Sequence, residues 1–318
     1  MNTLLRLVGT MLLAIPLFAQ AQYPTKPIRL VLPFPAGGVA DAVARIVGQR
    51  LSQRLGQPVI VDNRPGADGA IAGETVMKAA NDGYTLLFGT SSTLSAVPAL
   101  RKKPPYDPVA DFTPISLIGR FSFFVFVRPD MQAKTLAEFV RYARANPGKL
   151  NYGTGNTPSI LATAQFKSLA GIDMLQVPYK GDAPAIIDLL GGRVDMVIAS
   201  TVPALALAKE GKIRALAALL GRRSSHLPDV PTMVEAGFPE YSVTSWAGLF
   251  GPAHLPREIV ELLAREMNTI LQQQDAKDQM ERQAFEIEGS TPDQLGVYVK
   301  AQREVWRRAA REAGIQPE

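Results

Sequence analysis

The 318-residue chain contains no cysteine and only two histidines, His226 and His254. The missing cysteines exclude disulfides, thiol nucleophiles, cysteine-ligated zinc, iron–sulfur clusters and a lipid attached to an N-terminal cysteine. Two histidines leave little room for a histidine-rich metal site or for repeated proton shuttling. We therefore expect neither a cofactor nor a metal site.

An excess of one charge is also missing. The chain has 34 Lys and Arg against 29 Asp and Glu, for a formal net charge of +5, and its basic residues are scattered among acids. Nucleic-acid-binding proteins gather basic residues into a patch, so we expect no nucleic-acid partner. Hydrophobic residues make up 47% of the chain, which is enough to bury a core. At about 100–200 residues per domain, the length predicts two domains.

Long apolar runs are confined to the N-terminus. Arg6 precedes an apolar run over 7–18, and Ala19-Gln20-Ala21 then matches the small-x-small cleavage pattern. The run is too short for a membrane span, and no later stretch reaches the ~18 apolar residues that a span needs. We predict that residues 1–21 are a cleaved signal peptide and that the mature chain is exported, soluble and not lipid-anchored.

The remaining chain alternates between strand and helix patterns. Ile28–Phe34 is a continuous apolar run typical of a strand buried on both faces. Apolar residues at helical spacing follow over 39–55, and two further strands are predicted at 59–61 and 84–88. This β-α-β-α-β order predicts a parallel sheet with right-handed crossovers.

A second series of strands and helices follows a looser, proline-rich stretch at 98–114. It begins with a predicted strand at Phe121–Val127 and ends with one at Ile213–Leu219; Trp246–Phe250 then predicts a strand that returns to the first lobe. Long helices are expected near 256–273 and 292–313. The predicted fold class is α/β, with two doubly wound lobes and a ligand cleft between them. Lobe one would comprise residues 22–120 with 245–318, and lobe two residues 121–244.

Three loops connect the end of a predicted strand to the start of a predicted helix, and their residues are of similar chemistry. Glycine lets backbone amides approach a ligand, and a helix N-terminus presents unpaired N–H groups with a partial positive charge. Hydroxyl side chains add neutral donors. The candidate ligand-binding residues on the three loops are Phe34, Ala36, Gly37, Gly38 and Asp41; Thr90, Ser91 and Ser92; and Thr154, Gly155, Asn156, Thr157 and Ser159.

Turn geometry and helix capping explain each loop taken alone. Because the carboxyl ends of strands from two lobes meet at a cleft, the three loops together favour a pocket of neutral donors suited to a small organic carboxylate. Two roles are possible for Asp41. It would accept a hydrogen bond from a ligand ammonium or hydroxyl, or it would complement the dipole of the helix that it begins.

Motifs of catalytic sites are scarce. Gly153–Pro158 begins like a dinucleotide-binding fingerprint but has proline where the third glycine should stand. The sequence contains no Gly-x-x-x-x-Gly-Lys-Ser/Thr, Gly-x-Ser-x-Gly or His-Glu-x-x-His motif. Lys180 follows a strand and is expected to be solvated. We predict no catalytic residue. The alternatives are a secreted enzyme acting on a small carboxylate, with Asp41 as its general base, and a ligand-loaded sensor for a membrane receptor.

At these loops and over most of the mature chain, the sequence resembles the Bug-type solute-binding receptors of tripartite tricarboxylate transporters. The segments that carry the resemblance are PFPAGGVAD (33–41), VDNRPGADG (61–69), NDGYTLLFGTSST (81–93), PPYDPVADFTPIS (104–116), VPYKGDAPAIIDLLGGRVDM (177–196), GKIRALA (211–217), LPDVPTMVEAGFP (227–239) and SWAGLFGPA (245–253).

The resemblance implies a periplasmic protein that captures a small carboxylate between two closing lobes, in a fold like that of periplasmic binding proteins, and hands it to a membrane permease. We expect the protein to be monomeric. The ligand would be held by main-chain amides, hydroxyls and waters. Two departures concern the second lobe: Ile160 stands where a histidine is expected, and Ala199 and Ser200 stand where an aspartate often follows the strand. We add Ala199 and Ser200 to the candidate site, and expect a less polar wall there and a ligand with an apolar portion or with fewer charged groups than a tricarboxylate.

Overall fold

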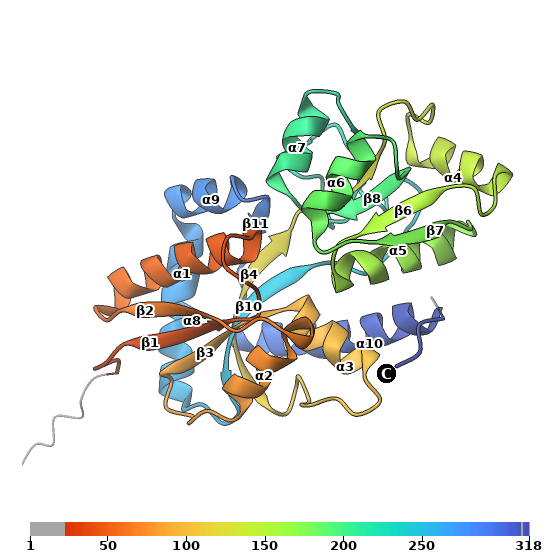
Figure 1. Ribbon diagram of the computed structural model, residues 1–318. Coiled ribbons are helices and arrows are strands. Elements are labelled where there is room, and N and C mark those ends of the chain that lie inside the picture. Colours follow the sequence, from red (N-terminus) through yellow and green to blue (C-terminus); the bar gives the residue numbers. More distant parts are fainter. Residues whose placement is uncertain (1–22, 313, 318) are drawn as a thin grey trace, which may run out of the picture.

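The computed structural model describes residues 23–312 and 314–317, which are built around two β-sheets (Figure 1). The signal peptide predicted at residues 1–21 lies outside the described residues. We call the part built on the six-stranded sheet lobe 1 and the part built on the five-stranded sheet lobe 2. No helix of the described residues is both long and apolar enough to cross a membrane.

The sheet of lobe 1 is mixed, with the strand order β11-β4-β10-β3-β1-β2. β1 pairs in parallel with β2 and with β3, as the alternating sequence pattern predicts. β10 is antiparallel to both β3 and β4, and β11 is antiparallel to β4. The strands are β1 (Ile28–Leu32), β2 (Val59–Asn63), β3 (Thr85–Thr90), β4 (Phe112–Phe121), β10 (Trp246–Pro252) and β11 (Phe285–Ile287).

Helices cover both faces of this sheet, which explains the continuous apolar run of β1. Ile28, Leu30 and Leu32 pack in one cluster with apolar residues of α1, whereas Val31 packs with those of α2 on the other face. A strand covered on both faces needs apolar side chains at successive positions. The helices of lobe 1 are α1 (Val39–Leu55), η1 (Ala67–Gly69), α2 (Ala70–Met77), η2 (Ser92–Ala96), α3 (Val97–Leu100), α8 (Arg257–Gln272), α9 (Gln274–Glu281) and α10 (Pro292–Glu312).

Lobe 2 repeats this arrangement on a smaller scale, with the strand order β7-β6-β8-β5-β9. β6 is parallel to β7 and β8, and β5 is antiparallel to β8 and β9. Its strands are β5 (Phe124–Val127), β6 (Asn151–Thr154), β7 (Leu175–Pro178), β8 (Met196–Ala199) and β9 (Arg214–Ala218). Its helices are α4 (Leu136–Ala145), α5 (Thr157–Ala170), α6 (Asp182–Leu190) and α7 (Val202–Lys209).

The first crossing between the lobes corrects a sequence prediction. We expected one strand over Phe121–Val127, but β4 ends at Phe121 in lobe 1 and β5 begins at Phe124 in lobe 2. Ser122 and Phe123 join the two strands. Since the run is apolar on both sides of this joint, hydrophobicity alone does not reveal the change of sheet.

Several elements of lobe 1 were missed by the pattern. β4 begins at Phe112 inside the stretch that we expected to be loose, and Pro114 lies at one of its register shifts against β10. A proline is tolerated at such an irregularity because the regular ladder is already interrupted. The short strand β11 and the helix α9 were also not expected.

The second crossing, residues 219–245, is fixed to α5 of lobe 2. The side-chain oxygen of Gln165 accepts hydrogen bonds from the N–H groups of Ser242 and Val243, at 3.1 and 2.9 Å. Helix α10 packs against β4 of lobe 1 and also against α5 (Figure 1). The C-terminal helix is therefore a further connection between the lobes.

Gly119 allows β11 to pair closely with β4. A Cβ at this position would lie 2.1 Å from the carbonyl oxygen of Glu286, so Gly119→Ala must displace β11. We expect a loss of about 1–3 kcal/mol in the free energy of unfolding, measured by urea denaturation. The matched control is Gly296→Ala in α10, where the new Cβ would meet Pro114 at an ordinary 3.5 Å; equal effects of the two substitutions would contradict the prediction.

Candidate functional site

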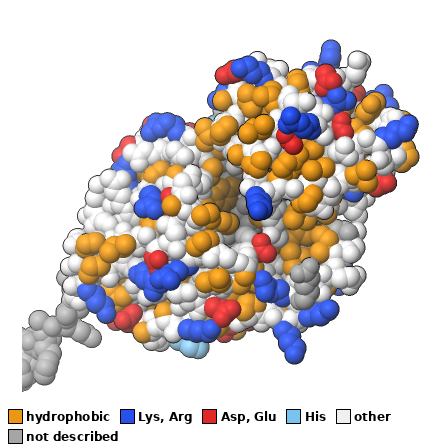
Figure 2. Space-filling model, viewed as in Figure 1, with side chains coloured by type: hydrophobic (Ala, Val, Ile, Leu, Met, Phe, Trp, Pro, Cys, Tyr) orange, Lys and Arg blue, Asp and Glu red, His pale blue; other side chains and the backbone are white. Residues whose placement is uncertain are grey.

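The carboxyl ends of β1, β3, β6 and β8 lie at the sheet edges where the lobes face each other. Thr90 at the end of β3 pairs with Ala247, next to one crossing, and Ala199 at the end of β8 pairs with Phe124, next to the other. Figure 2 shows a hollow between the two lobes on the face in view. The loops predicted to bind a ligand all follow these strand ends.

The first loop leaves space for a ligand at its glycines. Ala36, Gly37 and Gly38 are exposed, and a Cβ built on either glycine would meet nothing within 4 Å. Gly37 has a φ of +91°, whereas Gly38 caps α1 at φ −87° and provides no side chain for the first-turn amides. Phe34 is partly buried at the base of the loop, where its carbonyl oxygen accepts a hydrogen bond from Asn63.

The Asp41 side chain stabilises this loop through hydrogen bonds within the protein. Its carboxylate accepts hydrogen bonds from the Gly37 N–H at 3.0 Å, from Arg45 at 2.9 Å and from Asn63 at 2.9 Å. Burial by itself would raise the pKa of Asp41, but these hydrogen bonds and the charge of Arg45 outweigh it and lower the pKa below its usual value. Of the two interpretations of Asp41, the geometry favours the one within the protein, because its neighbours already occupy the carboxylate.

The second loop presents buried hydroxyls. The Ser91 and Ser245 hydroxyl oxygens lie 3.2 Å apart, and Ser92 donates to the carbonyl oxygen of Asp68 at 2.9 Å. Thr90 is buried beside Thr93. The following turn, η2, is a π-helix, a form that is frequent at functional sites.

The third loop is a capping box at the start of α5. The Ser159 N–H donates to the Asn156 side chain at 2.9 Å, and the Ser159 hydroxyl oxygen accepts from the N–H groups of Asn156 and Gly155, at 3.2 and 3.1 Å. Thr154 is buried, and its hydroxyl oxygen accepts from Gln176 at 2.9 Å. These bonds fix the loop before any ligand is present.

Ala199 ends β8, the central strand of lobe 2, and Ser200 follows it. Both are buried, and the Ser200 hydroxyl has no hydrogen-bond partner among the described residues. An unpaired buried hydroxyl is costly, so this group is suited to bind a ligand or a water.

Asp182 makes this wall more polar than we expected from Ile160 and Ala199. It is the first residue of α6, and its Oδ1 accepts a hydrogen bond from the Asn156 side chain at 2.7 Å. Burial raises the pKa of Asp182 to about 6, although the Ser200 N–H and Asn156 act in the opposite direction. Lys180, which is exposed as expected, lies two residues before this acid.

One hydrogen bond joins the lobes directly across the cleft. The Thr157 hydroxyl at the start of α5 donates to Oδ1 of Asp68 in lobe 1 at 2.6 Å. Asp68 has a left-handed backbone, φ 58°, between Gly66 and Gly69, and Ser92 fixes its carbonyl oxygen. The second and third loops are thus brought together through Asp68.

The predicted residues therefore fall into connected groups. Asp68 joins the Ser92 loop to Thr157, and Asn156 joins the third loop to Asp182 and, through it, to Ser200. Asp68, Asp182 and Ser245 were missed. Asp182 follows a strand end like the residues that were chosen, so the same rule would have found it; Asp68 and Ser245 are recognised only from contacts distant in sequence.

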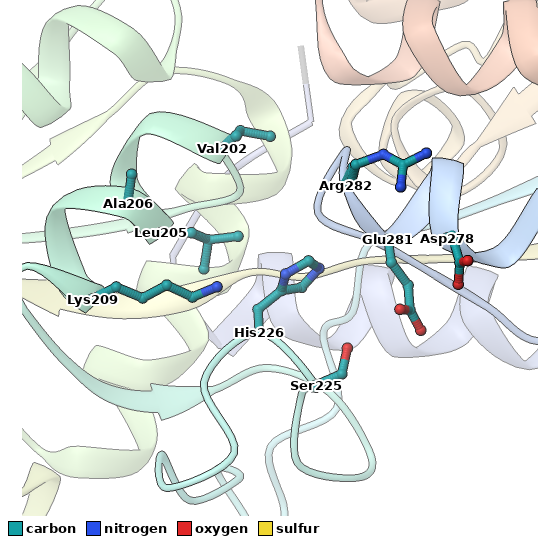
Figure 3. A pocket seen from close by; sticks show the side chains of 9 residues that line it. All are labelled: Val202, Leu205, Ala206, Lys209, Ser225, His226, Asp278, Glu281 and Arg282. Atoms are coloured by element: carbon teal, nitrogen blue, oxygen red, sulfur yellow. The ribbon is translucent and has the colours of Figure 1, made fainter. Parts of the chain in front are cut away.

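A cavity of about 500 Å³ lies between α7 and the 225–226 loop of lobe 2 and α9 of lobe 1 (Figure 3). His226 points into it, and burial together with nearby Lys209 lowers the pKa of this histidine. The lining combines the cations Lys209 and Arg282 with the acids Asp278 and Glu281 and includes none of the predicted donors. We do not assign the carboxylate to this cavity.

Comparisons with known proteins agree on one family. The family model described as tripartite tricarboxylate transporter family receptor matches residues 43–315. BugT of Bordetella pertussis strain Tohama I is 34% identical over 321 residues, covering 99% of this chain and 98% of BugT.

Solved structures are similar in both sequence and fold. A Rhodopseudomonas palustris protein, Rpa4515, solved with adipate, is 34% identical with a TM-score of 0.82 and covers 93% of this chain and 100% of its own. The periplasmic binding protein BugD is 31% identical with a TM-score of 0.79 over the same shares. MatC from Rhodopseudomonas palustris, with bound malate, is 31% identical with a TM-score of 0.76 and covers 90% of this chain and 99% of its own.

The hydrogen bond between Thr157 and Asp68 should stabilise the closed arrangement of the lobes. We expect Thr157→Val, which keeps the side-chain shape, to shift the closed-to-open ratio about fivefold toward open, since one such bond is worth about 1 kcal/mol. Because the natural chain has no cysteine, Gln53→Cys in α1 and Arg141→Cys in α4, both exposed positions, allow fluorescence energy transfer between the lobes. Thr75→Val, which removes a hydroxyl bonded only within α2, is the control. A distance distribution unchanged by Thr157→Val would exclude this role.

Proposed function

The chain belongs to the tripartite tricarboxylate transporter receptor family of solute-binding proteins, and we propose from this premise that it captures a small carboxylate in the cleft between lobes 1 and 2. The proposal rests on the meeting of neutral donors at the facing strand ends. The structurally similar Rpa4515 and MatC, with adipate and malate, support a carboxylate as the ligand class.

The proposed binding residues are the amides of Ala36 and Gly38 at the start of α1, the hydroxyl of Ser91, and the 154–159 loop with Ser200 in lobe 2. The Gly37 N–H is bonded to Asp41, so Gly37 contributes the shape of the loop. Preorganised amides carry a positive potential without a counter-ion that must first lose its water. Each neutral hydrogen bond contributes roughly 0.5–1.5 kcal/mol net, whereas a micromolar site requires about 8 kcal/mol. Several donors from both lobes must therefore converge on the ligand, which favours closure around it.

Periplasmic location and transport complete the proposal. The sequence at residues 1–21 matches a cleaved secretory signal, and the family is named for receptors of a transporter. We propose that the mature protein is monomeric and presents its closed, loaded form to the membrane components of a tripartite transporter. A membrane sensor would read the same closed form.

Catalysis would require a general base near the ligand. The candidate chosen from the sequence, Asp41, has a lowered pKa and is already hydrogen-bonded to three groups. Asp182 has a raised pKa and is the better candidate for a secreted enzyme that acts on the same carboxylate. Recovery of the ligand chemically unchanged after prolonged incubation with the protein distinguishes a receptor from such an enzyme.

Gly38 provides a direct test of the proposed site. In titration calorimetry with succinate, malate and adipate, we expect the wild type to bind at least one with micromolar affinity. Gly38→Val should weaken that binding at least about 100-fold, because its side chain enters the space next to the α1 amides, while the φ of −87° accommodates valine. Gly38→Ser, with a small side chain that caps helices well, serves as the control for folding. Undiminished affinity in a folded Gly38→Val variant would remove this loop from the site, and a wild type that binds no carboxylate would overturn the proposed function.

A further inference from the structure

We propose that Asp182 selects carboxylates that carry an ammonium group, so that the ligand is an amino acid or a related amino-carboxylate. This inference rests on the proposed function and assigns a specificity-determining role in the same cleft. An acidic side chain in a site for anions would repel the ligand unless the ligand also carries a positive charge. The contacts around Asp182 favour such a ligand.

Backbone pairing between two loops fixes the position of Asp182. The N–H groups of Tyr179 and Gly181 donate to the carbonyl oxygens of Thr154 and Gly155, at 2.8 and 3.1 Å. A Cβ at Gly155 would lie 2.4 Å from the Asp182 nitrogen and 2.5 Å from its Oδ1. The acid therefore lies directly against the third loop, which belongs to the proposed carboxylate site.

The partners of Asp182 are neutral. Its Oδ1 accepts from the Asn156 amide, and the Ser200 N–H also favours its ionised form. The hydrogen bond to its side chain comes from a neutral amide, and Lys180, two positions away, is exposed. A partly buried carboxylate without a counter-charge is unfavourable, and a ligand ammonium would supply that charge.

The Ser200 hydroxyl is a second polar group in the same wall of lobe 2, without a partner among the described residues. It is buried, and its own backbone N–H interacts with Asp182. An ammonium carries three donors, which match two acceptors of this kind better than a hydroxyl with one donor does. A ligand with carboxylates alone would instead place like charges near each other.

A purely structural role for Asp182 makes a different prediction. If Asp182 only links the starts of α5 and α6, its hydrogen bond to Asn156 is sufficient, and an asparagine at position 182 would also make that bond. Selection of an ammonium needs the negative charge. The difference between these roles is visible in ligand preference and not in stability.

The test uses pairs of ligands that differ only in the amino group: aspartate with succinate, and glutamate with glutarate, titrated calorimetrically into the full mature chain. We expect the wild type to bind the better amino ligand at least about tenfold more tightly than its partner, because hydrogen bonds between charged groups are worth about 1.5–3 kcal/mol. Malate, with a hydroxyl in place of the ammonium of aspartate, should be intermediate. Asp182→Asn should reduce the preference to within about threefold, mainly by weakening the amino ligand.

Asp188→Asn is the matched control, since Asp188 is another acid of α6 but is paired with Arg193 and Tyr179. It should leave the preference unchanged. Asp182→Ser provides a second variant if the asparagine disturbs the fold. Equal or tighter binding of succinate and glutarate by the wild type would overturn the selection while leaving the proposed function intact. Binding of neither member of either pair, while malate or adipate binds, would overturn the selection alone; binding of none of these carboxylates would overturn both.

Discussion

The cleft depends on hydrogen bonds that hold its loops in shape from within the protein. Asp41 accepts hydrogen bonds from the Gly37 amide and from Asn63. Asn156 and Ser159 are hydrogen-bonded to each other at the start of α5, and Ser92 donates to Asp68. A backbone amide is a useful donor only when its direction is fixed before the ligand arrives, because ordering a loop costs about 1–2 kcal/mol per residue. The polar side chains at these strand ends thus act largely on the protein itself and prepare neighbouring amides for a ligand.

The relation between the lobes follows from how the chain crosses between them. Two crossings and the contact of α10 with α5 tie the lobes together at one region, while Thr157 and Asp68 meet across the cleft. Lobes joined in this way can close as nearly rigid bodies, with the conformational change confined to a few residues near the crossings. A ligand held by groups of both lobes favours closure by the contacts that only the closed form makes.

The local sequence pattern predicts where strands and helices lie better than it predicts which strands pair with each other and in which direction. The parallel strands β1 to β3 follow from apolar runs separated by helical spacing, and the loops after them follow from glycine and hydroxyl residues at strand ends. The antiparallel direction of β10 and the pairing of β11 depend on contacts distant in sequence, which periodicity does not contain. The break between Phe121 and Phe124 is invisible because both sides of it are apolar and buried.

The same limit applies to the site, and Asp182 illustrates why. Departures at Ile160 and Ala199 suggested a less polar wall, yet the acid absent from the end of β8 is replaced by one at the start of α6, close enough to interact with Ser200. A wall's polarity is a property of the side chains that meet there, whichever strand they follow. The raised pKa of Asp182 is the physical mark of this arrangement: its environment disfavours the charged form, and a cation arriving with the ligand would reverse that preference. An acid without a counter-charge in the empty cleft would thereby discriminate between otherwise similar anions.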